Sequence, residues 1–124
     1  MNKFPVQLVV SDIDDTLIHK EDHLNEKIIQ TIEELKRRGI QFTLATGRMP
    51  YRAESYAGDA KLTVPFIANN GIILYDRGRM IWCKMLYAKI IKEITQRYME
   101  RNPQFTVIFS FTDRECPLVR TEWI

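Results

Sequence analysis

Short apolar runs, each ending in polar residues, recur in the first seventy residues of the chain. Residues 6–10 are mostly β-branched and apolar, and they stop abruptly at Ser11 and Asp12. This pattern is typical of a buried strand in a parallel sheet. Residues 40–45 and 65–68 have the same character and also lead into polar loops. We therefore predict three strands whose carboxyl ends, and the loops that follow them, lie at one edge of a sheet.

The residues between these runs have the spacing of helices. Residues 25–38 carry an apolar stripe, with Asn25 as a plausible N-cap and Gly39 just beyond the last turn. The stripe consists of Ile28, Ile29, Ile32 and Leu35. Residues 50–57 begin with proline and predict a second, shorter helix. An alternation of strand, helix, strand, helix and strand indicates the α/β class, with right-handed crossovers in a Rossmann-like parallel sheet.

The pattern changes after the third strand. Residues 72–75 and 80–82 predict a hairpin. Residues 87–101 have a helical stripe, residues 105–111 alternate as a strand, and residues 117–121 suit a further short strand. The second part of the chain is therefore predicted to be an α+β segment joined to the parallel core.

Size and charge limit the interpretation without adding a function. The 124 residues are 45% hydrophobic, enough for one core, and we place residues 1–82 in that core and residues 83–124 in the appended segment. The 18 basic and 16 acidic residues form no long run of one sign, so we expect no nucleic-acid partner. No apolar run is long enough to predict a membrane span, and no secretory segment is evident, so we expect a cytoplasmic protein.

The loop after the first predicted strand concentrates acidic side chains. Asp12 and Asp14 lie two residues apart, and Asp15 and Thr16 follow them. One aspartate after a strand is a common turn residue, but a crowded pair needs a cation, and Mg²⁺ prefers such oxygen ligands. With Mg²⁺ present, Asp12 can attack a phosphoryl group to form an aspartyl-phosphate, while Asp14 protonates the leaving oxygen and then activates water.

Three stretches at the predicted strand ends share a family resemblance. Residues 8–17, an apolar strand followed by the pattern DxDxT, resemble the first motif of the haloacid dehalogenase superfamily, and residues 45–48 resemble its second. Together with residues 67–71, they are similar to the Cof-like branch. Members of that branch dephosphorylate sugar phosphates, phosphorylated cofactors and related small metabolites. The resemblance implies a Rossmann-like core with an inserted α+β cap, and a phosphatase that requires Mg²⁺.

The resemblance also assigns roles to individual residues. It implies that Asp12 is the nucleophile and a Mg²⁺ ligand, and that Asp14 is the general acid and base, with its backbone carbonyl on the metal. Thr46 and the amide of Gly47 would hold the phosphoryl group. Further residues on the substrate or cap side would be Arg48 and Asn70, and Asn70 is the more direct contributor to site geometry or substrate contact.

The sequence departs from the family pattern in two respects. Asp15 stands where many relatives have glycine, and we expect the loop to persist because aspartate tolerates left-handed backbone. The lysine and the further acidic motif that family members carry after the cap have no match, and residues 112–115 do not replace them. We therefore expect a truncated product or fragment with severely reduced phosphatase activity. We also expect an uncovered sheet edge that favours self-association into a homo-oligomer.

Three functional hypotheses remain open at this point. The first is a phosphatase of small phosphorylated metabolites. The second is a non-catalytic remnant that binds Mg²⁺ or phosphate weakly, or serves only in self-assembly, which the missing motifs favour. The third is a phospho-accepting signalling domain, which also uses a strand-end aspartate but does not need the loop at residues 46–48 or the α+β segment.

Overall fold

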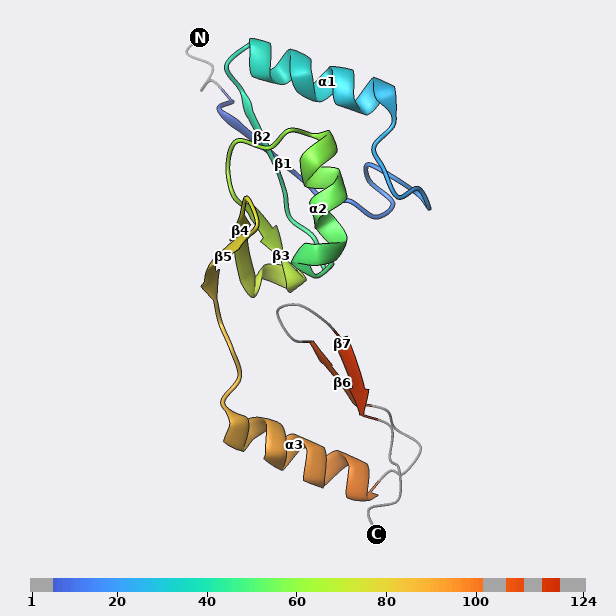
Figure 1. Cartoon of the computed structure of the whole chain (residues 1–124), viewed down its shortest axis with the longest axis vertical. Helices are drawn as coiled ribbons and strands as arrows, with labels where there is room; N and C mark the ends of the chain where they lie inside the picture. The colour runs from blue at the N-terminus through green and yellow to red at the C-terminus, as the bar shows by residue number, and fades with distance from the viewer. Residues whose placement is uncertain (1–5, 102–106, 111–114, 119–124) are drawn as a thin grey trace. The chain divides into compact units, whose positions relative to one another are not determined.

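The computed structural model of the chain describes residues 6–101, 107–110 and 115–118 (Figure 1). The chain divides into two compact units, Met1–Cys83 and Lys84–Ile124. The identification of residues 1–82 as a catalytic core and residues 83–124 as a cap stays a prediction. The two units are described separately below.

The first unit contains the predicted parallel strands. Strand β1 (Leu8–Ser11) pairs in parallel with β2 (Gln41–Leu44). A parallel bridge between Ala45 and Ile67 then joins the end of β2 to β3 (Phe66–Ala68). The predicted α/β class, with parallel strands and connecting helices, is confirmed. As a result, the loops that follow β1, β2 and β3 lie at one edge of the sheet.

The two predicted helices are also present. Helix α1 (Glu26–Arg37) begins after Asn25, whose side-chain oxygen accepts a hydrogen bond from the amide of Ile28 at 3.0 Å. Gly39, just past its end, has a φ of +76°, a left-handed conformation that glycine adopts without steric cost. Helix α2 (Pro50–Asp59) has proline in its first turn. The capping residues read from the sequence therefore set the limits of α1.

One apolar core holds the first unit together. Its most deeply buried large side chains are Ile13, Leu44 and Tyr56, which come from the loop after β1, from β2 and from α2. Ile32 of α1 is also buried, and it belongs to the same cluster. Because Ile13 lies between Asp12 and Asp14, the packing that stabilises the unit also fixes the loop that carries the predicted chemistry.

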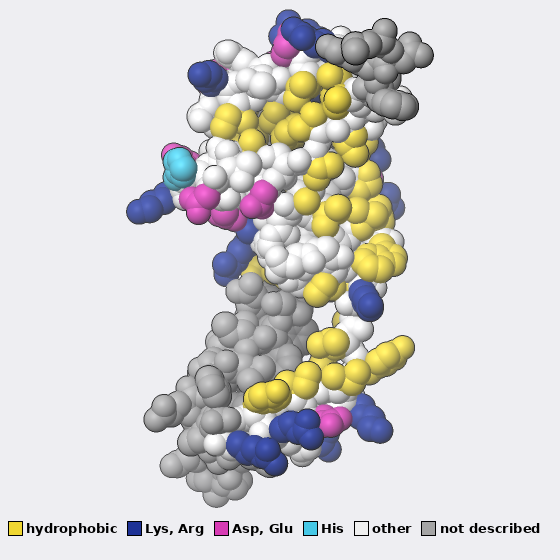
Figure 2. All heavy atoms as spheres, turned by 180° about the vertical axis from the view of Figure 1, so that it is seen from behind, with side chains coloured by type: hydrophobic (Ala, Val, Ile, Leu, Met, Phe, Trp, Pro, Cys, Tyr) yellow, Lys and Arg dark blue, Asp and Glu magenta, His cyan; other side chains and the backbone are white. Residues whose placement is uncertain are grey.

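Strand β1 is less buried than its apolar sequence predicted. The side chains of Leu8 and Val10 are 46% and 49% exposed. Within the described residues β1 pairs only with β2, so one edge and part of one face lack a neighbour. An apolar run indicates that a strand can be buried, but it does not state how many strands flank it. Figure 2 shows hydrophobic side chains gathered along one face of the first unit.

A hairpin completes the first unit. Strand β3 pairs antiparallel with β4 (Ile73–Asp76), which pairs antiparallel with β5 (Arg79–Cys83). The two turn residues, Arg77 and Gly78, have φ values of +43° and +78°. Two successive left-handed residues are the requirement of the type I′ turn, whose twist matches that of a hairpin. The predicted hairpin is confirmed.

The second unit is small and of mixed type. It contains α3 (Ala88–Arg101), β6 (Val107–Ser110) and β7 (Glu115–Leu118), and the two strands pair antiparallel. The predicted helix is confirmed, and both predicted strands are present, the last beginning two residues earlier than predicted. Residues 105, 106, 111 and 119–121 of the predicted strands lie outside the described residues. Among the described residues, no helix combines the length and apolar character that crossing a bilayer requires.

Candidate active site

The loop after β1 is built around the main chain of Ile13. The carbonyl oxygen of Ile13 accepts hydrogen bonds from the amides of Thr16, Leu17 and Ile18, at 3.3, 2.9 and 3.1 Å. Its side chain is fully buried, whereas its neighbour Asp12 is exposed. The loop therefore folds tightly on an apolar anchor and leaves the carboxylate of Asp12 accessible.

The loops after β2 and β3 are held together by their backbones. The amide of Thr46 donates to the carbonyl of Ile67 at 3.0 Å, and the amide of Asn70 donates to the carbonyl of Thr46 at 3.1 Å. The amide of Asn69 donates to the carbonyl of Arg48 at 2.8 Å. Three backbone bonds therefore place the two loops side by side as one support.

Four of the six predicted site residues line one open hollow of about 350 Å³. They are Asp12, Thr46, Gly47 and Asn70. They come from three loops that lie far apart in the sequence, and the parallel strand ends bring them together. The other two predicted residues, Asp14 and Arg48, are not among those that line this hollow.

The side chain of Asn70 approaches Gly47 closely. A Cβ at position 47 would lie 2.9 Å from Oδ1 of Asn70, which is closer than carbon and oxygen normally approach. The φ of Gly47 is not left-handed, so any cost of a side chain here comes from space and not from backbone conformation. Glycine at this position lets the second and third loops share one wall of the hollow.

Gly47→Ala should make the exposed side chain of Asn70 rotate aside, and should lower the free energy of unfolding by no more than about 1.5 kcal/mol, the scale of a strained rotamer. Urea unfolding followed by circular dichroism would measure the change. Gly58→Ala is the matched control, because a Cβ there meets nothing within 4 Å and alanine favours the helix α2. A loss of more than about 3 kcal/mol would show that Asn70 cannot move aside.

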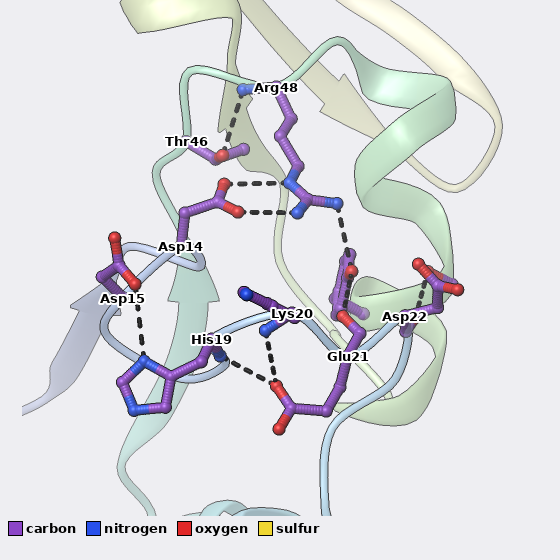
Figure 3. A network of polar contacts seen from close by, with 10 residues as sticks. Asp14, Asp15, His19, Lys20, Glu21, Asp22, Thr46 and Arg48 are labelled. Atoms are coloured by element: carbon purple, nitrogen blue, oxygen red, sulfur yellow. Dashed lines mark hydrogen bonds and ion pairs between the residues drawn. The ribbon is translucent and has the colours of Figure 1, made fainter.

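Asp14 forms a two-point ion pair with Arg48 (Figure 3). Nε of Arg48 donates to Oδ2 of Asp14 at 2.9 Å, and Nη2 donates to Oδ1 at 2.6 Å. The guanidinium holds the pKa of Asp14 below its usual value, and the same contact raises the pKa of Arg48. The structure therefore shows the predicted acid and base as a paired carboxylate, an arrangement that sequence reasoning did not anticipate.

Asp15 adopts the left-handed backbone that its position requires. Its φ is +55°, in the region that glycine, asparagine and aspartate occupy more readily than other residues. The expectation that the loop tolerates aspartate here is confirmed. The side chain of Asp15 is 88% exposed, and its carboxylate lies 3.4 Å from Nδ1 of His19.

Tyr56 is a site neighbour that sequence reasoning missed. Its ring is 1% exposed, its hydroxyl accepts a hydrogen bond from Nη1 of Arg48 at 3.0 Å, and it donates one to the carbonyl of Glu21 at 2.8 Å. The available signal was its helical spacing with Ala53 and Ala60, which predicts a buried face of α2. That spacing gives no indication of the hydroxyl's partners.

The site offers oxygen donors of the kind that Mg²⁺ prefers. The carboxylate of Asp12 is exposed at the rim, and by family resemblance the carbonyl of Asp14 would be a second ligand. In the part of the chain that the structure describes, no group of three or more His, Cys, Asp or Glu side chains is placed to hold a metal. Mg²⁺ is commonly bound by one or two carboxylates, with water and phosphate completing its shell, so the described residues would supply only part of that shell.

Comparison with known proteins agrees with this geometry. The family model of haloacid dehalogenase-like hydrolases matches residues 9–116. The HMP-PP phosphatase of Shigella flexneri serotype 5b is 37% identical over 115 residues, which cover 90% of this chain and 42% of that protein. A putative phosphatase of Buchnera aphidicola is 32% identical over 91 residues, covering 73% and 34% respectively. The chain belongs to the haloacid dehalogenase-like hydrolases, and the predicted resemblance to their Cof-like branch is confirmed.

Solved structures show the same fold. A Thermotoga maritima protein superimposes with a TM-score of 0.73 at 26% identity, covering 95% of this chain and 44% of that one. A Bacteroides thetaiotaomicron phosphatase of the haloalkanoate enzyme superfamily gives a TM-score of 0.75 at 21% identity, covering 94% and 43%. The chain therefore spans less than half the length of each of these relatives.

Proposed function

We propose that this chain carries the nucleophile half of a phosphatase site that acts on small phosphorylated metabolites through an aspartyl-phosphate. The observation that supports this most directly is the shared hollow of Asp12, Thr46, Gly47 and Asn70. Relatives named as phosphatases, including an HMP-PP phosphatase and a structurally similar sugar phosphatase, support the same reaction class. The signalling-domain hypothesis has no comparable support.

The proposed reaction has two steps. The carboxylate of Asp12 attacks phosphorus, and the bond from phosphorus to the leaving oxygen breaks. The leaving oxygen takes its proton from the protonated form of Asp14, which is a minority form because the contact with Arg48 lowers the pKa of this carboxyl group. Asp14 then accepts a proton from water, whose oxygen attacks the phosphorus of the aspartyl-phosphate. The bond between phosphorus and the Asp12 oxygen breaks, which releases phosphate and restores both carboxyl groups to their starting states.

Thr46 and Gly47 would stabilise the phosphoryl oxygens during both steps. Oγ1 of Thr46 accepts a hydrogen bond from the amide of Arg48 at 3.1 Å, which leaves the hydroxyl hydrogen free to be donated to a bound oxygen. Asp12 and the carbonyl of Asp14 would hold Mg²⁺, which when bound neutralises charge on the phosphoryl group. Donors fixed in advance by the backbone cost little reorganisation during the reaction.

A direct test of the proposed function uses the 124-residue polypeptide with Mg²⁺ and an aryl phosphate. We expect slow hydrolysis, because this sequence contains no match to the family's lysine or its second acidic motif, and those groups would offset charge on Asp12 and complete the metal site. Covalent labelling of Asp12, described in the Discussion, is the sharper measurement. Failure to bind phosphate in the presence of Mg²⁺ would count against the proposal.

The second candidate, self-association, is favoured by the edge of β1. The carbonyls of Gln7 and Ser11 accept bonds from the β2 side, so the alternating peptide groups of Leu8 and Val10 face the opposite edge. Within the described residues no strand pairs with that edge, and both side chains are about half exposed. An edge of this kind is a template for pairing with a second copy.

Sedimentation velocity over a wide concentration range should therefore show a dimer or larger species. Val10→Lys should shift the polypeptide towards monomer, because a lysine on an edge strand opposes pairing. Lys27→Arg, a change on the exposed side of α1, is the control and should leave the association unchanged. A single monomeric species at every concentration would refute this second candidate.

A further inference from the structure

The hydroxyl of Tyr56 joins two parts of the first unit that lie far apart in the sequence. It accepts a hydrogen bond from Arg48 and donates one to the carbonyl of Glu21, and the carbon of the guanidinium lies 5.0 Å from the centre of its ring. Arg48 uses its other two donor groups, Nε and Nη2, for Asp14. The hydroxyl oxygen of Tyr56 therefore contacts Arg48, the side chain that pairs with Asp14, the predicted acid and base.

The loop that receives the Tyr56 hydrogen bond is itself fixed to α2. Oγ of Ser55 donates to the carbonyl of Asp22 at 3.2 Å. The carboxylate of Asp59 accepts the amide of Leu24 at 2.9 Å and also contacts Nδ1 of His23. Because these contacts attach one loop to one helix, the carbonyl of Glu21 is a fixed acceptor.

The geometry of Arg48 depends on having a third contact. Two bonds to Asp14 define the plane in which the guanidinium and carboxylate lie, but they leave the pair free to swing together on two flexible side chains. The bond from Nη1 to the Tyr56 hydroxyl fixes the far corner of the guanidinium to α2. Without that hydroxyl, both Nη1 and the carbonyl of Glu21 lose their protein partner. Water can replace it, because Arg48 and Tyr56 line an open hollow, but a mobile water molecule does not fix the guanidinium to α2.

We propose that Tyr56 is a positioning residue of the phosphatase site, which sets the orientation of Arg48 and, through it, the direction of the Asp14 carboxylate. The importance of that direction rests on the proposed function, because a general acid must lie within hydrogen-bond reach of the leaving oxygen. Tyr56 itself touches no reacting atom. Its contribution is to restrict where the pair of Asp14 and Arg48 can lie.

The test follows the side-chain Nε–H signal of Arg48 by nuclear magnetic resonance on chain labelled with nitrogen-15 arginine. Loss of the signal in Arg48→Lys assigns it. In Tyr56→Phe we expect exchange of this hydrogen with water to become about tenfold faster or more, because the pair opens more often. Tyr51→Phe is the matched control, since Tyr51 lies on the same helix, is 39% exposed and lines the surface beside Arg48.

Thermal unfolding of each variant separates a local effect from loss of the fold. A folded Tyr56→Phe variant with unchanged Arg48 exchange would overturn the proposal, as would an equal effect from Tyr51→Phe. A measurement on the unmodified chain tests the proposal even if Tyr56→Phe does not fold. In that chain we expect the hydroxyl hydrogen of Tyr56 to exchange slowly with water and to show a nuclear Overhauser contact to Arg48. The absence of this signal would also overturn the proposal. None of these measurements requires turnover. If Asp12 is not phosphorylated, the proposed function is refuted, but the positioning of Arg48 by Tyr56 is not.

Discussion

Asp12→Asn should abolish covalent phosphorylation of the chain by radioactive acetyl phosphate in the presence of Mg²⁺. An amide cannot replace the carboxylate as nucleophile, so we expect labelling to fall by at least about a thousandfold, the scale seen when a nucleophile is removed. The measurement is the label retained by denatured protein and released by hydroxylamine, as expected for an acyl phosphate. Detection of a covalent product remains informative even where complete turnover is slow.

Asp15→Asn is the control for the Asp12 experiment. It makes the same change of carboxylate to amide three residues away in the same loop, on a side chain that is 88% exposed. Asparagine also tolerates the left-handed backbone at this position, where φ is +55°. This control should retain full labelling. Equal labelling of the Asp12→Asn variant would place the nucleophile elsewhere.

Ile13→Ala should lower the free energy of unfolding by about 2–5 kcal/mol, the range for removing buried methyl groups from a close-packed core. Ile13 is fully buried and anchors the loop through its carbonyl, so the cavity would form directly beneath Asp12 and Asp14. Total stabilities of small domains are about 5–15 kcal/mol, so this is a large fraction. Urea unfolding followed by circular dichroism would measure it.

The comparison for Ile13 is Ile72→Ala. Ile72 is 41% exposed, and shortening it should cost less than about 1 kcal/mol. If the two substitutions cost the same, Ile13 would not be the anchor that its burial indicates. A large loss at Ile13 together with weakened labelling of Asp12 would instead connect the apolar core to the chemistry above it.

Local signals in the sequence predicted the elements of the fold well. Asn25 and Gly39 mark the ends of α1 through backbone requirements that act within a few residues, and the turn at Arg77 and Gly78 depends on two adjacent φ values. The exposure of β1 could not be predicted in the same way. Burial of a strand depends on how many neighbours it has, which a five-residue apolar run does not encode.

The candidate site was predicted in part for a similar reason. Parallel strands place their carboxyl ends at one edge, so sequence order alone indicates that Asp12 and Thr46 lie near each other. The ion pair between Asp14 and Arg48 could not be predicted, because it joins residues 34 positions apart through the rotamers of two flexible side chains. The close approach of Gly47 and Asn70 likewise depends on how two loops pack, which appears only in three dimensions.

The left-handed backbone at Asp15 separates two kinds of constraint within one acidic cluster. At Asp12 the carboxylate itself carries the proposed chemistry, so a change of functional group should matter more than a change of shape. At Asp15 the φ of +55° carries the requirement, so glycine and asparagine should substitute freely, whereas valine or isoleucine should distort the loop even though they add no charge. The effect of a substitution at Asp15 should therefore depend on whether the new residue tolerates a left-handed φ. The effect of a substitution at Asp12 should depend on whether the new side chain can act as a nucleophile.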